Sequence, residues 1–198
     1  MYLRSHTKGY IDLTGGKVDV TDPGYDKDTW CRINNIKVAP DRYRCYYWIG
    51  DRLEENEKEE IKEMWEESDK TQFATYEEFY KFWSKADIGR VCISAIISEK
   101  FLKKNHNYFS FKDERWEEIG KIGVDAGLAG YFPDKPDFDG DEWSKFCNYM
   151  YDRDRATKLY AYNTKLGFWT SSGWGDGWYP VYAIRSNNEI VALKIEFC

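Results

Sequence analysis

A glycine-rich segment near the C-terminus has the most unusual spacing of residues that could do chemistry. Residues 171–179 read SSGWGDGWY, and their three glycines stand at alternate positions. A glycine costs up to about 1 kcal/mol in an ordered element, so this spacing indicates positive φ or close approach by a ligand or another strand. Asp176 could turn its carboxylate into a site, and the indoles of Trp174 and Trp178 could stack on a flat ligand. The alternative is a wide hairpin whose aspartate caps its own turn.

A second candidate carboxylate stands at the end of an expected strand. Residues 124–132 read VDAGLAGYF, so Asp125 directly follows the β-branched Val124, and Gly127 stands two residues further on. A carboxylate at a strand end can act as a general base or a metal ligand, although chains also simply turn there. A joint site would require Asp125 and Asp176 to converge within on the order of 4 to 8 Å.

These two segments resemble a known family. VDAGLAGYF, SGWGDGWYPVY and the closing strand EIVALKIEF are similar to an uncharacterised bacterial family, the domain of unknown function DUF-4241. The resemblance covers roughly residues 115–198 and extends more loosely to the N-terminal strands, while the glutamate-rich stretch 53–70 is not matched. It implies relatedness and a shared geometry around Asp125 and Asp176. It implies no activity, because none is assigned to that family.

An acidic stretch offers a third candidate site. Asp137, Asp139 and Asp141 alternate along the chain, as the ligands of a calcium loop do. With Gly140 at the sixth loop position, however, a lysine and a phenylalanine would occupy the first and twelfth positions, where acidic ligands are required. We therefore expect these acids to cap and solvate the following helix, with an irregular divalent-cation site as the alternative, and we expect no other cofactor.

Familiar catalytic signatures do not occur in the sequence. It has no G-x-S-x-G, P-loop, H-E-x-x-H or G-x-G-x-x-G motif, and only His6 and His106 could serve a Ser–His or Cys–His mechanism. Five widely spaced cysteines without a C-x-x-C pair indicate neither a disulfide framework nor a zinc ribbon. Residues 1–6 lack the apolar core of a secretory signal, and no apolar run approaches membrane-spanning length. We therefore expect a cytoplasmic protein without a membrane segment.

The charge balance makes nucleic acid an unexpected partner. The 198 residues include 35 Asp and Glu against 29 Lys and Arg, which gives a formal net charge of −6. Binding to a phosphate backbone favours clustered cations, and the richest basic run, residues 100–104, is one short segment. We expect that run in a solvated loop or at a helix end. An acidic face instead favours a basic protein partner.

Period-two patterns and turn residues predict a β-rich framework. Apolar residues alternate over 91–98, and the last strand, 191–197, alternates as a half-buried strand does. The last strand is expected to pair with residues 178–184 across an Asn-Asn turn, with Pro180 at a sheet edge or a bulge. Near the N-terminus, residues 14–17, TGGK, predict a hairpin.

Helical spacing occurs mainly in a charged middle segment. Between about residues 53 and 88 the chain is rich in Glu and Lys, and its narrow apolar stripes predict two helices. Thr75 and Glu78 have the spacing of a capping box at the start of the second helix. A third helix is predicted over about 139–150. The whole chain, 1–198, is therefore expected to be a single α+β domain of mainly antiparallel strands with three helices, two of them in 53–88, a possible insertion.

The chain is unusually rich in aromatic residues. They make up 18% of the chain, with 9 Trp, which is more than one small core requires. In a first hypothesis, the protein is a binding module that recognises a protein partner, as inhibitor-like and immunity-like proteins do. In a second, Asp125 and Asp176 serve a carboxylate-based, possibly metal-dependent, hydrolase or hold a small ligand such as a sugar or a nucleotide.

Overall fold

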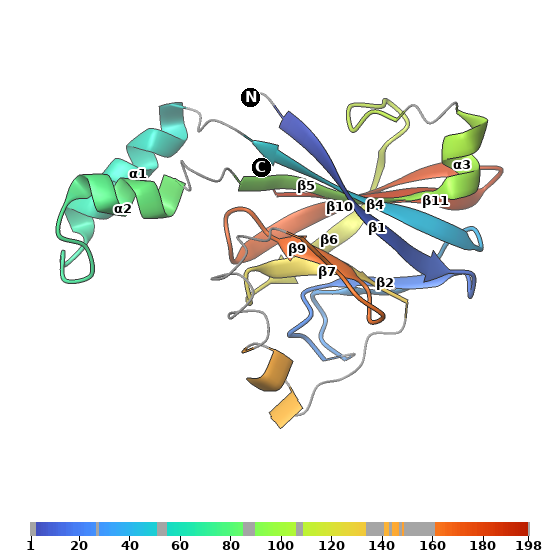
Figure 1. Ribbon diagram of the computed structural model, residues 1–198, viewed down its shortest axis with the longest axis horizontal. Helices are drawn as coiled ribbons and strands as arrows, with labels where there is room; N and C mark the ends of the chain where they lie inside the picture. The colour runs from blue at the N-terminus through green and yellow to red at the C-terminus, as the bar shows by residue number, and fades with distance from the viewer. Residues whose placement is uncertain are drawn as a thin grey trace.

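The described strands form two antiparallel sheets (Figure 1). The structure is a computed structural model that describes residues 3–26, 28–50, 55–84, 90–105, 109–133, 141–142, 144–146, 148 and 161–197. The six-stranded sheet has the order β1 (Leu3–Leu13), β4 (Asp41–Gly50), β5 (Arg90–Ser98), β11 (Glu189–Glu196), β10 (Gly177–Ser186) and β6 (Glu117–Val124). The five-stranded sheet has the order β3 (Ile33–Lys37), β2 (Lys17–Thr21), β7 (Leu128–Phe132), β9 (Phe168–Ser171) and β8 (Ala161–Asn163). With its helices, this architecture is the predicted α+β fold of mainly antiparallel strands.

The two sheets pack face to face around the main hydrophobic core. Leu13 of β1 and Tyr43 of β4 share this core with Val20 and Tyr131 of the other sheet, and these four side chains are at most 1% exposed. Burial of a side chain of this size contributes about 1.5–3 kcal/mol. The hydroxyl of Tyr131 also donates a hydrogen bond of 2.8 Å to the carbonyl oxygen of Ser94 in β5, so a polar contact joins the sheets as well.

The outer face of the six-stranded sheet is covered too. Helix α3 (Glu99–Lys104) places Phe101 and Leu102 against it, and Phe109 and Trp116 extend this layer. The sequence expectation of a half-buried last strand is therefore wrong. Six consecutive residues of β11, from position 190 to 195, are buried, because one sheet face meets the core and the other meets this outer layer.

Lys194 shows how the covered face accommodates a charge. The side chain is 5% exposed, and its ammonium donates a hydrogen bond of 3.1 Å to the carbonyl oxygen of Phe111 and pairs with Glu196. The ammonium also lies 4.5 Å from the ring centre of Tyr182 and 5.0 Å from that of Trp116. Hydrogen bonds, an ion pair and aromatic faces together offset the cost of taking this charge out of water.

The two predicted hairpins have different outcomes. Strands β10 and β11 pair in antiparallel fashion as expected, across a turn in which Asn187 and Asn188 have positive φ. Pro180 lies next to a register shift of β10 and outside the stretch that pairs with β11, in agreement with its predicted edge or bulge position. The hairpin predicted at residues 14–17 is wrong. The turn is present, but β1 and β2 belong to different sheets, so the turn is a corner between the layers.

The helices of the middle segment are confirmed as α1 (Glu55–Glu67) and α2 (Tyr76–Ser84). Thr75 caps α2 as predicted, since its hydroxyl accepts from the Glu78 amide at 3.2 Å. The Glu78 carboxylate reaches back one residue further than in a capping box and accepts from the amide of Ala74 at 3.0 Å. Of the helix predicted over about 139–150, residues 141, 142, 144–146 and 148 are helical and the others lie outside the described residues. No described helix has both the length and the apolar character needed to cross a membrane.

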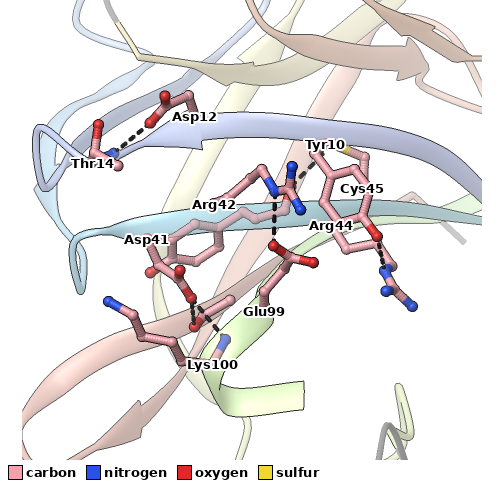
Figure 2. A network of polar contacts seen from close by, with 11 residues as sticks. Tyr10, Asp12, Thr14, Asp41, Arg42, Arg44, Cys45, Glu99 and Lys100 are labelled. Carbon is pink, nitrogen blue, oxygen red and sulfur yellow. Dashed lines mark hydrogen bonds and ion pairs between the residues drawn. The ribbon is translucent and has the colours of Figure 1, made fainter. Parts of the chain in front are cut away.

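Helix α3 is an addition to the predicted three, and a polar network fixes it to the sheet (Figure 2). The Asp41 carboxylate accepts hydrogen bonds from the Ser98 hydroxyl and, at 2.8 Å, from the Lys100 amide at the start of the helix. Burial alone would raise the pKa of Asp41, but these hydrogen bonds outweigh it and the pKa is lowered. Arg42 pairs with Glu99 at 2.7 Å, which joins β4 to the same helix.

The α1–α2 pair stands apart from both sheets. Figure 1 shows the two helices projecting beside the end of the sandwich where β4 ends and β5 begins. We call residues 55–84 the helical arm and the rest of the chain the β-body. The arm has a small interior of its own, in which Ile61 and Phe79 are buried and Trp65 packs 5.3 Å from Phe79 between ring centres. Whether the arm is an insertion in evolution stays a prediction.

Candidate functional site

A buried carboxylate holds together the loops at one end of the sandwich. Asp22, at the end of β2, is fully buried, and one of its oxygens accepts hydrogen bonds from the amides of Asp125 (2.8 Å) and Ala126 (2.7 Å). The other oxygen accepts from the amide of Gly24 at 2.7 Å. Burial raises the pKa of Asp22, and the three N–H donors, which favour the charged form, offset part of that rise. The sequence segment around Asp125 is thus fixed through its backbone.

A buried arginine braces the loop that follows Asp22. The guanidinium of Arg32 pairs with Asp19 of β2 at 3.1 Å and donates to the carbonyl oxygen of Tyr25 at 3.1 Å. Its side chain is completely buried, so removing the carboxylate of Asp19 would leave a buried charge without its counter-ion. The loop between β2 and β3 is therefore held at its first turn by Asp22 and at its last turn by Arg32.

A glycine in β6 lets this loop approach the six-stranded sheet. The amide of Gly123 donates a hydrogen bond of 2.8 Å to the carbonyl oxygen of Cys31. A Cβ atom on Gly123 would lie 3.0 Å from the Cβ and 3.2 Å from the Sγ of Cys31, closer than such atoms ordinarily approach. The absence of a side chain at this position is what allows the loop to pack on the sheet edge.

The loop and the sheet edge enclose a hollow of about 360 Å³, which we call the tryptophan hollow. Its lining residues are Tyr25, Thr29, Trp30, Cys31, Gly123, Val124, Gly177 and Trp178. The rings of Trp30 and Trp178 lie 5.0 Å apart between centres and are tilted by 40°. They are 81% and 52% exposed, so two large apolar side chains meet at the surface instead of in the core.

The tyrosine of the hollow is set among groups that keep it protonated. Burial, a hydrogen bond with the thiol of Cys31, and the charges of Asp22 and Asp125 together raise the pKa of Tyr25. Cys31 is buried and forms no disulfide, and the same holds for Cys45 and Cys92.

The glycine-rich loop lies beside this hollow, and its glycines have the backbone geometry that the sequence predicts. Gly173, Gly175 and Gly177 all have positive φ, of 67°, 92° and 156°. A Cβ on Gly173 would lie 2.4 Å from the carbonyl oxygen of Val91, so the loop also passes close to the start of β5. The hydroxyl of Tyr179 in β10 donates to the carbonyl oxygen of Gly175 at 3.0 Å and so ties the loop to this strand.

The structure brings the two candidate carboxylates to the same end of one strand pair. Val124 of β6 is paired with Gly177 of β10, so Asp125 and Asp176 are the next residue on each strand beyond that pair. Both aspartates are exposed. The two residues are therefore neighbours along the backbone, and both adjoin the lining of the tryptophan hollow. The convergence of their carboxylates on one site stays a prediction.

The other predicted residues have different positions in this site. Trp178 lines the hollow, whereas Trp174 is 38% exposed on the glycine-rich loop. Gly127 has a positive φ of 64°, and its carbonyl oxygen accepts from the amide of Ser172 at 3.0 Å, which ties the two candidate segments together. Its role is thus structural. Asp141 is exposed on a helical segment, while Asp137 and Asp139 lie outside the described residues.

Sequence reasoning missed the residues that complete the site. Trp30, Tyr25 and Cys31 come from a loop whose residues 26–32 read DKDTWCR, and only the isolated tryptophan in that polar stretch could have signalled an exposed ring. Asp22 stands before a proline in a turn sequence, and its bonds to residues about a hundred positions away have no local signature. Within the described ranges, no three His, Cys, Asp or Glu side chains group together as metal ligands would.

Comparisons with family models, with curated proteins and with solved structures gave no match to this chain. The resemblance of the segments around Asp125 and Asp176 to DUF-4241 therefore stays a prediction.

Proposed function

We propose that the protein is a binding module that recognises a protein partner, with the tryptophan hollow as its contact site. The observation that carries this proposal is the exposed Trp30–Trp178 pair. Tryptophan and tyrosine are enriched among the residues that dominate binding energy at protein interfaces, because each buries a large rigid surface at small entropic cost. The cytoplasmic inhibitor-like and immunity-like proteins are the corresponding functional class.

The rigidity of the site supports this proposal. Asp22 and Arg32 fix the loop that carries Trp30, and Tyr179 fixes the glycine-rich loop. Side chains that are already ordered lose little freedom on binding, so less of the interaction energy is spent on ordering them. A preorganised aromatic surface of this kind suits recognition of a fixed shape.

The rim of the hollow favours a basic partner. Asp125 and Asp176 present exposed carboxylates next to Val124 and Gly177, which line the hollow. A lysine or arginine side chain placed here could contact an indole face through its cation and one of the carboxylates through a hydrogen bond. The formal net charge of −6 acts in the same direction by attracting a basic protein over a distance.

The proposal is tested by capturing the partner from the source cell with immobilised protein. We expect one protein to be recovered in stoichiometric amount by the wild type and lost with the double variant W30A/W178A. L166A removes an exposed apolar side chain on the far β8–β9 turn and serves as the matched control. Equal capture by W30A/W178A and L166A would show that the tryptophan hollow is not the contact site.

A second candidate function is supported by the adjacency of Asp125 and Asp176. A small ligand such as a sugar or a nucleotide could stack on an indole and bond to these carboxylates, with or without a divalent cation. A thermal-shift screen with divalent metals, nucleotides and oligosaccharides separates the two functions, because a ligand of the native state raises the melting temperature. A shift that disappears in D125N/D176N, with no captured protein, would favour this second function.

A further inference from the structure

The tryptophan hollow is built over one glycine of β6. Gly123 stands opposite Trp178 in the register of β6 and β10, and its amide bonds to Cys31 instead of to β10. Residues opposite each other in such a pair have their side chains close together on one face, so Trp178 stands beside a position without a side chain. A Cβ there would also lie 3.7 Å from the hydroxyl oxygen of Tyr25. The indole, the phenol and the loop of Trp30 therefore meet over a floor of backbone.

This floor belongs to the face of the sheet that is turned away from the main core. Ile122 and Tyr179, which precede Gly123 and follow Trp178, are buried in that core. Side chains alternate between the two faces along a strand, so the hollow lies on the opposite face. There the rings of Trp30 and Trp178 are largely exposed. Tryptophan is the best aromatic partner of a cation, which lies over the face of the ring.

The charges next to the hollow are negative. Four exposed aspartates are each adjacent in sequence to a lining residue: Asp26, Asp28, Asp125 and Asp176. Besides burial and the contact with Cys31, the charges of Asp22 and Asp125 raise the pKa of Tyr25, so a negative potential reaches the phenol. None of the described residues that line the hollow has a charged side chain. A cation that enters would therefore meet charges of the opposite sign around a neutral lining.

One cation on the same face gives the site a direction. Lys121 is exposed and stands two residues before Gly123 in β6, so its side chain lies on the face that carries the hollow. Asp125 lies at the other end, beyond the last residue of the strand. A cationic occupant is thus expected to direct its charge toward Asp125 and away from Lys121.

The shape of the site favours a guanidinium over an ammonium group. The ring centres of Trp30 and Trp178 are 5.0 Å apart and the rings are tilted by 40°, so they present an angled wall and not a closed cage. A planar guanidinium can stack on one indole while its N–H groups, which lie in its plane, bond to a carboxylate beside it. An ammonium is more strongly hydrated and loses more solvation for the same contact.

We propose that the tryptophan hollow receives one arginine side chain of the protein partner. Its guanidinium stacks on the indole of Trp30, the more exposed of the two, and donates hydrogen bonds to the carboxylate of Asp125. Its alkyl stem lies over the backbone of Gly123. The inference rests on the proposed function in taking the occupant from a protein partner. It adds which side chain anchors that partner.

Three capped peptides test this inference on the full chain. The probe is glycine–arginine–glycine, and its counterparts carry lysine or the neutral isostere citrulline at the central position. Binding is followed by NMR through the indole N–H signals of Trp30 and Trp178, which W30A and W178A assign. We expect saturable shifts with arginine, about threefold weaker binding with lysine, and no saturable shift with citrulline. Equal binding of all three peptides, or of none, would overturn the inference.

Matched variants then locate the guanidinium. D125N removes the exposed charge beside the hollow, whereas E117Q makes the same change in charge at the first residue of β6. We expect D125N to weaken binding of the arginine peptide about three- to tenfold and E117Q to stay within about twofold. W30A should abolish the shift of the remaining Trp178 signal. Equal weakening by D125N and E117Q would also overturn the inference.

The failure of this inference is distinguishable from failure of the proposed function. If W30A/W178A loses the captured partner, but the wild type does not prefer the arginine peptide to citrulline, the function stands and the arginine anchor is wrong. Binding of the arginine peptide together with equal capture by W30A/W178A and L166A would instead overturn the proposed function. The hollow would then be a site for a free guanidinium compound.

Discussion

The β-body and the helical arm treat charge in opposite ways. In the β-body, Asp22, Arg32 and Lys194 are buried, and each has several partners that compensate its charge. In the arm, Glu59, Glu63 and Glu67 of α1 are exposed and stand four residues apart, so their charge is directed to solvent. Buried, compensated charges fix a shape, whereas exposed, uncompensated charges create a field. One chain thus places compensated charges in one region and exposed ones in another.

The same division appears in the aromatic residues. The tryptophan hollow is set on strands and on a loop that Asp22 and Arg32 fix at both ends. The exposed ring of Phe82, which contacts Phe73, is set on a two-helix arm with a small interior. We expect the hollow to depend strongly on the integrity of the β-body and the arm surface to depend on local helix stability.

The largest effect is expected for D22A. The substitution removes the acceptor of three partly buried hydrogen bonds, from the amides of Gly24, Asp125 and Ala126. Unsatisfied donors cost about 1–3 kcal/mol each, and partial rehydration leaves a total of about 3 kcal/mol. For a chain of this size the melting temperature should fall by about 6–12 °C. D176A removes an exposed carboxylate at the same end of the sandwich and should change it little. Similar melting temperatures for both variants would contradict the role given to Asp22.

A smaller effect on stability, with a specific effect on the site, is expected for G123A. The added Cβ would lie 3.0 Å from the Cβ of Cys31, so the loop must move away from β6. Overpacking of this kind costs about 1–3 kcal/mol. The contact between Trp30 and Trp178 should loosen, which circular dichroism in the aromatic region would detect. G15A is the matched control, because no atom lies within 4 Å of a Cβ there. An unchanged aromatic spectrum for G123A would show that the loop does not depend on this contact.

A third effect concerns the pH dependence of stability that the buried carboxylate of Asp41 causes. The pKa of Asp41 is lowered in the folded state, so its contribution to stability is present above the pKa of the unfolded chain, near 4. That contribution is lost as the pH falls through the lower folded pKa. D41N should therefore cost about 1–2 kcal/mol at neutral pH and lose less stability than the wild type on acidification. Unfolding by urea between about pH 2 and pH 7 measures this difference. Parallel curves for both proteins would rule out Asp41 as a source of the acid sensitivity.

Local patterns were sufficient for much of the fold. The pairing of β10 with β11 across the Asn-Asn turn and the Thr75 cap of α2 are decided by residues close together in the sequence, and both predictions are confirmed. The half-buried interpretation of β11 failed because the layer that covers its outer face comes from α3, which is too short to show a helical period. Its cap, Ser98, is the last residue of a strand, so the start signal is hidden in a β pattern.

The site could be predicted only in part, for a related reason. Asp125, Asp176 and Trp178 belong to segments whose glycines mark them, and the sheet register brings these segments together as expected. Trp30 belongs to a loop without any periodicity, and its position depends on Asp22 and on the missing side chain of Gly123. Contacts of this kind join residues about a hundred positions apart. No local pattern in one sequence encodes them, because they depend on the register of two sheets.

The smallest effects are expected in the arm, where two charge changes should alter the local stability in opposite directions. Glu59, Glu63 and Glu67 stand four residues apart along α1. E63K changes the charge at the middle position, so that repulsion from Glu59 and Glu67 becomes attraction. Pairs at this spacing contribute about 0.2–0.5 kcal/mol each, so the arm should gain about 0.5–1 kcal/mol. Hydrogen exchange of the arm amides measures this gain, and exchange in β5 and β11 should not change.

E77K is the matched opposite, because Glu77 lies four residues before Lys81 in α2. The substitution replaces an opposite-charge spacing by a like-charge one, and the arm should lose about 0.5 kcal/mol. Both variants change the net charge of the protein by the same amount. If the arm responded only to net charge, E63K and E77K would shift its exchange rates in the same direction. Opposite shifts would show that the row of glutamates in α1, and not the overall acidity of the arm, sets its local stability.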